Sequence, residues 1–214
     1  MQDLQKINFR LQTADEIPPA LNQADCPWHQ IAQCNWPEKF PYRPKVAFRI
    51  AYTDEALLLH YRVEEEQIMA LAEDNGPIWT DSCVECFISP AEDGYYYNIE
   101  ANCIGNMLIG CGQSRHDRER GDKEVRDRVL RWSSLGREPL GERPHDAPWE
   151  LALLIPFSCF FKHQIDSLEG RHIRANFYKC GDGLTRPHYL SWQPINTEKP
   201  DFHRPEFFGT LYCK

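Results

Sequence analysis

The segment from Val46 to Val63, "VAFRIAYTDEALLLHYRV", is the stretch that decides the fold. Apolar side chains occupy every second position in two runs, which are Val46, Phe48, Ile50 and Tyr52, then Leu57, Leu59, Tyr61 and Val63. A period of two is that of a β-strand with one buried face. The intervening "TDEA" is typical of a turn. The segment therefore predicts a β-hairpin.

Other parts of the chain repeat this pattern. The segment "DSCVECFIS" (81–89) alternates in the same way, with Glu85 on the face opposite to Val84. "EDG" then predicts a turn, and "YYYNIEANCIG" (95–105) predicts the next strand. Further strands are expected in 129–132, 149–160, 172–183, 187–195 and 206–213. Short strands joined by turn signals predict an all-β protein, a two-sheet antiparallel β-sandwich with long loops.

The length of 214 residues fits a single domain spanning 1–214. Residues 1–45 are punctuated by prolines and lack a clear period, so we expect an irregular N-terminal part. Residues 113–148 are dense in charges of both signs and predict a charged surface excursion. One short helical turn is expected in "EEEQIMALAEDNG" (64–76).

The net charge of −8 argues against a general affinity for nucleic acid or an anionic membrane, because both partners need clustered positive charge. No run approaches the roughly 18 apolar residues of a membrane span. The start, "MQDLQKINFRLQ", lacks the layout of a signal peptide. Nine cysteines cannot all pair within one chain, which favours a reducing, cytoplasmic compartment, unless a signal segment for export was removed.

Cys83 and Cys86 form a C-x-x-C motif. A zinc site usually needs two such pairs, and the sequence has no second one. Residues three apart in a strand point to opposite faces, unlike the redox pair at the start of a thioredoxin-like helix. We therefore expect Cys86 to fill the core, Cys83 to be a surface or cavity-lining thiol, and neither a metal nor a cofactor to be bound.

Glu85 and Glu100 lie on the polar faces of consecutive predicted strands. If these strands pair, directly opposed side chains are about 5 Å apart. Two carboxyl groups at that distance suit a retaining glycosidase. They equally suit hydrogen bonding to sugar hydroxyls, because a carboxylate accepts several hydrogen bonds. Two solvated acids on an exposed strand are the third interpretation.

Six tryptophans add to the case for sugar binding, since an indole can stack on the C–H face of a pyranose. Most of them fit a strand or core position. Trp79 differs, because it follows "DNGP" and precedes a strand, which predicts a loop edge.

Six segments together, in this order, resemble carbohydrate-binding module family 9, and more closely its stand-alone relatives from gut Bacteroides. They are "GPIWTDSCVECFISP", "YYYNIEANCIGNML", "WELALLIPF", "RANFYKCGDG", "HYLSWQPI" and "PDFHRPEFFGTLY". The similarity runs from about Trp28 to the C-terminus. It implies a β-sandwich that binds sugars and has no catalysis of its own.

The resemblance also implies roles for particular residues. Trp79 and Phe202 match the two walls of an aromatic clamp, although the family's well-known member has Trp at the position of Phe202. Glu85 matches a strand glutamate that bonds sugar hydroxyls. Glu100 stands where that member carries Arg.

A further polar contact of the family falls near Lys179. The resemblance thus places Lys179 among the groups that bond sugar hydroxyls, and Lys179 or Arg204 would offset the repulsion between Glu85 and Glu100. The implied ligand is a mono- or oligosaccharide, and chain ends are the family's known target. Some members carry structural calcium, but this sequence has no EF-hand-like loop.

Two alternatives remain beside a binding protein. The first is a glycoside hydrolase that uses Glu85 and Glu100. The second is a haem-binding sandwich, which needs axial Met or His ligands, and the three methionines form no obvious pair.

Overall fold

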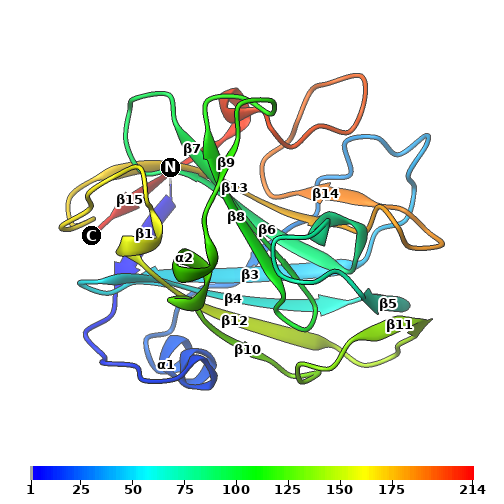
Figure 1. The fold of residues 1–214 in the computed structure, drawn as a ribbon, viewed down its shortest axis with the longest axis horizontal. Helices are drawn as coiled ribbons and strands as arrows, with labels where there is room; N and C mark the ends of the chain where they lie inside the picture. The colour runs from blue at the N-terminus through cyan, green and yellow to red at the C-terminus, as the bar shows by residue number, and fades with distance from the viewer. Residues whose placement is uncertain (1) are drawn as a thin grey trace.

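The computed structural model describes residues 2–214, and its strands form two crossing layers (Figure 1). The strands are β1 (Gln2–Lys6), β2 (His29–Gln30), β3 (Lys45–Tyr52), β4 (Ala56–Glu64), β5 (Gln67–Ala70), β6 (Cys83–Ser89), β7 (Tyr96–Asn102), β8 (Met107–Gly112), β9 (Glu119–Arg120), β10 (Leu130–Ser133), β11 (Leu140–Pro144), β12 (Trp149–Pro156), β13 (His172–Cys180), β14 (Tyr189–Ser191) and β15 (Gly209–Cys213). The helices are α1 (Ile17–Gln23) and α2 (Lys123–Asp127), with single 3-10 turns at η1 (Ala14–Glu16), η2 (Ile78–Thr80), η3 (Phe157–Cys159) and η4 (Pro205–Phe207).

The two layers meet along β1. Sheet A has the order β15-β13-β6-β7-β8-β9, with β14 paired to β13. Sheet B has the order β10-β12-β4-β3, with β2 paired to β3. Strand β1 pairs with β15 on one side and with β3 on the other. A separate ribbon consists of β5 and β11.

The predicted hairpin is present as β3 and β4. Val46 lies opposite Val63, and Tyr52 lies opposite Leu57. The predicted antiparallel pairing holds for every strand pair between residues 2 and 214 except those of β1, which is parallel to both neighbours. The sandwich itself is confirmed, and the correction concerns the seam where β1 joins its two sheets.

Two expectations about secondary structure were wrong, and a third segment is more ordered than expected. Residues 1–45 are not irregular throughout, because they contain β1, α1 and β2; the prolines of α1 stand in its first turn, where a helix tolerates them. The helical turn expected in 64–76 is strand β5, in which Ile68 and Ala70 are buried at a spacing of two. The excursion 113–148 carries β9, α2 and β11 in addition to β10, which lies where a strand was expected.

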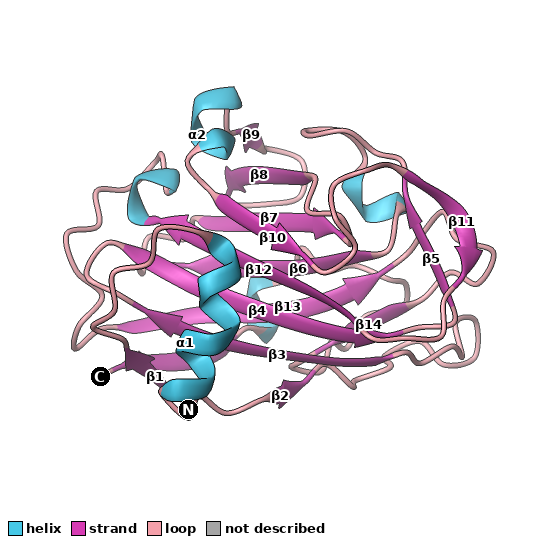
Figure 2. Cartoon of the chain, turned by 90° about the horizontal axis from the view of Figure 1, so that it is seen from below, coloured by secondary structure: helices cyan, strands magenta, loops and turns pink. Residues whose placement is uncertain are grey.

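The main core lies between the sheets. Apolar side chains from the inner faces meet there, and the rings of Phe48 and Phe177 stack with 3.8 Å between centroids. The outer face of sheet B is covered by α1, whose Leu21 packs with Leu58 (Figure 2). The outer face of sheet A carries the side chains that line the cavity described below.

All nine cysteines are free thiols, and eight of them are buried. Within residues 2–214, the helices are too short or too polar to cross a membrane.

Candidate functional site

A cavity of about 320 Å³ opens on the outer face of sheet A. Its floor is formed by side chains of β6, β7 and β8, and its rim by loops that follow β5, β13 and β14. The volume lies near the lower end of the range of small-molecule sites, roughly 300–1,000 Å³. A ligand of one or a few sugar rings fits such a space.

Two carboxyl groups occupy the floor. Glu85 on β6 and Glu100 on β7 are direct partners in the antiparallel register, which confirms that they are neighbours. Their exposed fractions are only 3% and 4%, so they are not solvated acids on an open strand. The alternation in β6 explains the placement: Val84, Cys86 and Ile88 enter the main core, and Glu85 therefore points to the outer face.

The electrostatics of this pair are dominated by burial. Burial, followed by the proximity of Glu100, holds the pKa of Glu85 well above its usual value. Burial raises the pKa of Glu100 to about 7, although a hydrogen bond from Asn98 and the charge of Arg120 act in the opposite direction. Both carboxyl groups therefore favour a partner that donates hydrogen bonds or brings positive charge.

A polar network orients Glu100. Asn98 Nδ2 donates to Glu100 Oε1 at 2.8 Å, and Arg118 Nη2 donates to Asn98 Oδ1. The Arg118 guanidinium lies 4.3 Å from the centre of the Tyr96 ring and also donates to backbone carbonyls. Glu100 Oε2 is buried without a hydrogen-bond partner among residues 2–214. The acceptor capacity of this oxygen is therefore unused within residues 2–214.

The two predicted clamp residues line the same cavity. Trp79 lies on η2 with 36% of its surface exposed, and its carbonyl accepts a hydrogen bond from the Asp182 N–H at 3.0 Å. Phe202 is only 9% exposed, because one face stacks on Tyr178 with 4.2 Å between centroids and 10° between planes. Trp79 is thus the more accessible ring, and Phe202 has one face already occupied.

Two further predicted residues do not line the cavity. Lys179 is fully buried on the opposite face of β13, where its Nζ lies 2.9 Å from Glu65 Oε2 and 2.8 Å from His188 Nε2. Its expected contact with a sugar is therefore corrected: Lys179 is a core residue. Arg204 pairs with Glu206 at 2.7 Å on the surface and offsets no charge in the floor.

Sequence reasoning missed several lining residues. Asn98 could have been found, because the alternation of β7 places it on the same face as Glu100. Arg118 could not, because it lies in the charged segment that was predicted to be a surface excursion. Cys180 was also missed, since its approach to Cys83 depends on the pairing of β13 with β6.

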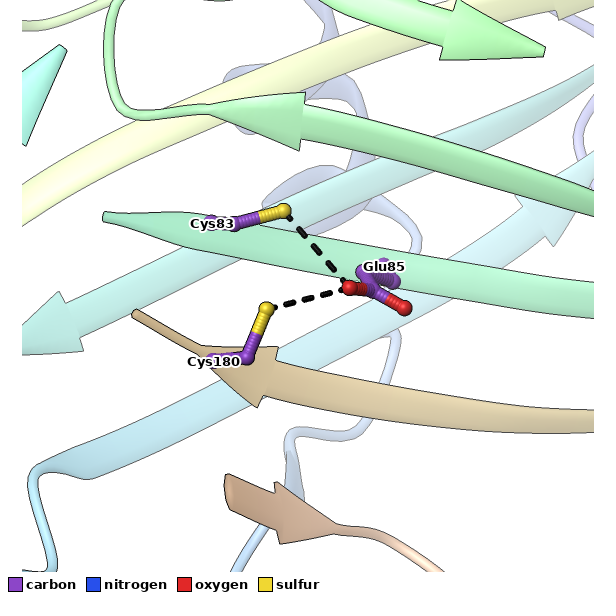
Figure 3. Close-up of side chains that lie close together, drawn as sticks. All are labelled: Cys83, Glu85 and Cys180. Atoms are coloured by element: carbon purple, nitrogen blue, oxygen red, sulfur yellow. Dashed lines mark hydrogen bonds between the residues drawn. The ribbon is translucent and has the colours of Figure 1, made fainter. Parts of the chain in front are cut away.

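The expectation for Cys83 needs correction. The Cys83 side chain is fully buried rather than exposed, and its Sγ lies 3.8 Å from Glu85 Oε1. Cys180 Sγ lies 3.1 Å from the same oxygen (Figure 3). The three groups form a compact cluster at the edge of the cavity floor, and Cys86 fills the core on the other face as expected.

Comparisons with known proteins identify the family and the fold of the chain. The family model of carbohydrate-binding family 9 matches residues 15–213. A candidate carbohydrate-binding protein from Bacteroides uniformis has 44% sequence identity and a TM-score of 0.96, covering 99% of this chain and 98% of that chain. A search of curated proteins gives no match.

Two structures of a family 9 module from Caldicellulosiruptor kristjanssonii are more distant. The complex with cellotriose has a TM-score of 0.63 and covers 100% of this chain and 94% of the other. The complex with glucose has a TM-score of 0.62 and covers 100% and 96%. Both have 12% identity, so their likeness concerns the fold.

Proposed function

This chain belongs to carbohydrate-binding family 9, and from that premise we propose that it binds a mono- or oligosaccharide in the cavity of sheet A without transforming it. The observation that carries the proposal is the placement of one exposed indole, Trp79, on the same cavity as the opposed pair Glu85 and Glu100. A sugar needs both an apolar ring for its C–H face and acceptors for its hydroxyls. Glucose and cellotriose, the ligands of the distant structures, are the first candidates.

In the proposed complex, the sugar ring stacks on Trp79. Its hydroxyls donate to the Glu85 carboxyl group and to Glu100 Oε2, which has no partner among residues 2–214. Phe202 closes the cavity with its remaining face. Lys179 and Arg204 have no part in this arrangement, because neither lines the cavity.

Isothermal titration tests the proposal. We expect a Kd between about 1 µM and 1 mM, which corresponds to roughly −8 to −4 kcal/mol. Trp79→Ala should weaken binding at least about tenfold, because the loss of a stacking ring removes more than about 1.4 kcal/mol of apolar burial. Trp28→Ala is the matched control, since Trp28 is 38% exposed and lies outside the cavity. Equal affinity of the two variants would reject the clamp.

We also propose that the cavity binds the end of a sugar chain, and this has its own test. Cellotriose and its borohydride-reduced form differ only at the terminal ring, which is open in the reduced sugar. A site that encloses a reducing end should bind the reduced form much more weakly. Equal binding of the two would show that the cavity accepts internal or non-reducing units.

Glycoside hydrolysis is the second candidate, and the direct opposition of Glu85 and Glu100 favours it. Against it, the pKa of both groups is raised, whereas a retaining enzyme needs one ionised carboxylate as nucleophile. Turnover of an aryl glycoside that disappears in Glu85→Gln would establish this activity. If the wild-type protein releases no aryl group, hydrolysis is rejected and the binding function remains.

A further inference from the structure

We propose that Cys83, Glu85 and Cys180 form a binding site for a thiophilic divalent cation, with Zn²⁺ as the best match. Figure 3 shows both sulphur atoms directed at one carboxylate oxygen. The Cys180 Sγ–Glu85 Oε1 distance is 3.1 Å and the Cys83 Sγ–Glu85 Oε1 distance is 3.8 Å. All three ligand atoms lie within 4.8 Å of one another.

The Cys83 Sγ–Glu85 Oε1 distance matches an edge of a zinc coordination shell, and the Cys180 Sγ–Glu85 Oε1 distance is somewhat shorter than such an edge. With Zn–S bonds of about 2.3 Å and Zn–O bonds of about 2.0–2.2 Å, neighbouring ligand atoms in a tetrahedron are roughly 3.5–3.8 Å apart. Small side-chain rotations would therefore bring the three atoms around one ion.

The sheet holds the three residues in place. Cys83 on β6 and Cys180 on β13 are direct register partners, and Glu85 lies two residues further along β6 on the same face. The exposed fractions are 0% for Cys83, 3% for Glu85 and 1% for Cys180. Paired strands in the middle of a sheet form a rigid support, which is what a preorganised metal site requires.

The lack of a competing cation is the second observation. Among residues 2–214, no salt bridge joins a Lys, Arg or His side chain to Glu85, so an ion at the cluster meets no competing positive side chain. The neighbouring Lys179 points to the other face of the sheet and pairs with Glu65. Glu100, the register partner of Glu85, has one buried oxygen, Oε2, without a hydrogen-bond partner among residues 2–214.

Three protein ligands leave a coordination position open, as in zinc sites that hold a water or a substrate. Glu85 and Cys180 both line the cavity, so this position faces the ligand space. The second oxygen of Glu85 points away from the sulphur atoms (Figure 3). The ion would thus hold a water or a sugar hydroxyl at the floor, while two thiolates select Zn²⁺ over the oxygen-seeking Ca²⁺.

The first experiment uses the whole chain, stripped of metal and kept reduced. Titration with Co²⁺ should produce a thiolate-to-cobalt charge-transfer absorption that saturates at one ion per chain. Zn²⁺ should remove this absorption by displacing Co²⁺, and Ca²⁺ should not. A wild-type protein that shows no such absorption would overturn the proposal without recourse to any variant.

Variants then assign the ligands. Cys180→Ser should lose the absorption, while Cys34→Ser, which changes a partly exposed thiol elsewhere, should keep it. Glu85→Gln retains both thiols and should weaken Zn²⁺ binding by more than about tenfold, since even outer-shell changes cost 10–100-fold. Full metal binding in Cys180→Ser would refute the site. Mass spectrometry of metal-free protein purified without reductant provides a further check. A Cys83–Cys180 disulfide would show that the two thiols form a redox pair and not a metal site.

Discussion

Lys179 shows how one residue is assigned by its environment rather than by its type. A lysine beside a sugar-binding strand is a natural partner for hydroxyl groups. In this protein it is fully buried and forms an ion pair with Glu65, which also accepts a hydrogen bond from the Trp149 indole at 2.9 Å. A buried pair of this kind depends on both members, because either one alone leaves an uncompensated charge.

The ion pair gives a prediction at the residue scale. Lys179→Met should lower the free energy of unfolding by about 3–5 kcal/mol, because it leaves Glu65 buried without its partner. Chemical denaturation measures the change. Adding Glu65→Gln should restore part of the loss, since it removes the orphan charge and keeps an acceptor for Trp149.

A matched control lies on the surface of the predicted hairpin. Lys45 and Glu64 also form an ion pair, at 3.1 Å, but their side chains are 80% and 45% exposed. Lys45→Met should therefore change stability by less than about 0.5 kcal/mol. A similar cost for the two lysine substitutions would contradict the structural role of Lys179.

At the scale of the elements, β6 and β13 each serve two purposes. Their inner-face residues fill the main core, and their outer-face residues reach the cavity and the cysteine cluster. Because the side-chain period of a strand is two, a slip of one residue would exchange the two sets. The apolar faces of these strands therefore fix the register on which the site depends.

Strand β1 gives a prediction at this scale. It joins the sheets by parallel pairing with β15 and β3, and its Leu4 is 1% exposed in the main core. Leu4→Ala should cost about 2–5 kcal/mol of stability, because the cavity left behind opens at the seam. Asp3→Ala is the control, since Asp3 is exposed on the same strand. Thermal unfolding measures both variants. Equal unfolding temperatures of Leu4→Ala and Asp3→Ala would show that the seam does not support the fold.

At the scale of the whole molecule, buried histidines connect stability to pH. Burial lowers the pKa of His60 to about 4 and that of His203 to about 3. The charge of Arg49 also disfavours a protonated His60, while the hydrogen bond with Glu150 at 2.9 Å acts in the opposite sense. Both rings are neutral in the folded chain and near pKa 6.5 in the unfolded chain.

The sign of the effect follows from proton linkage. Below about pH 6.5 each of these two histidines binds more protons in the unfolded chain than in the folded one, so its contribution to stability falls as the pH decreases towards about 4. Glu85 and Glu100, whose pKa is raised in the folded chain, contribute with the opposite sign. His60→Gln removes one of these two groups. Between neutral pH and about pH 4, the free energy of unfolding of this variant should therefore fall by roughly 2–3 kcal/mol less than that of the wild type. Denaturation curves over this range give the difference. His116→Gln, at an exposed ring, should follow the wild type, and parallel profiles for all three proteins would contradict the prediction.

The sequence by itself determined the architecture and part of the site. Period-two runs predicted the β3–β4 hairpin, the alternating faces of β6 and β7, and hence the opposition of Glu85 and Glu100. These features are local, because the alternation of apolar and polar residues along a strand determines which side chains share a face. The position of Trp79 just before β6 was readable from another local signal, the turn-forming residues "DNGP" that precede it.

Only the tertiary structure decided the rest. The approach of Cys180 to Cys83, the pairing of Lys179 with Glu65, and the stacking of Phe202 on Tyr178 all join residues far apart in the chain. Within residues 64–76, Gln67–Ala70 likewise form strand β5 through pairing with β11. Such contacts depend on which strands become neighbours and on what each side chain meets when it is buried, and no local pattern contains that information.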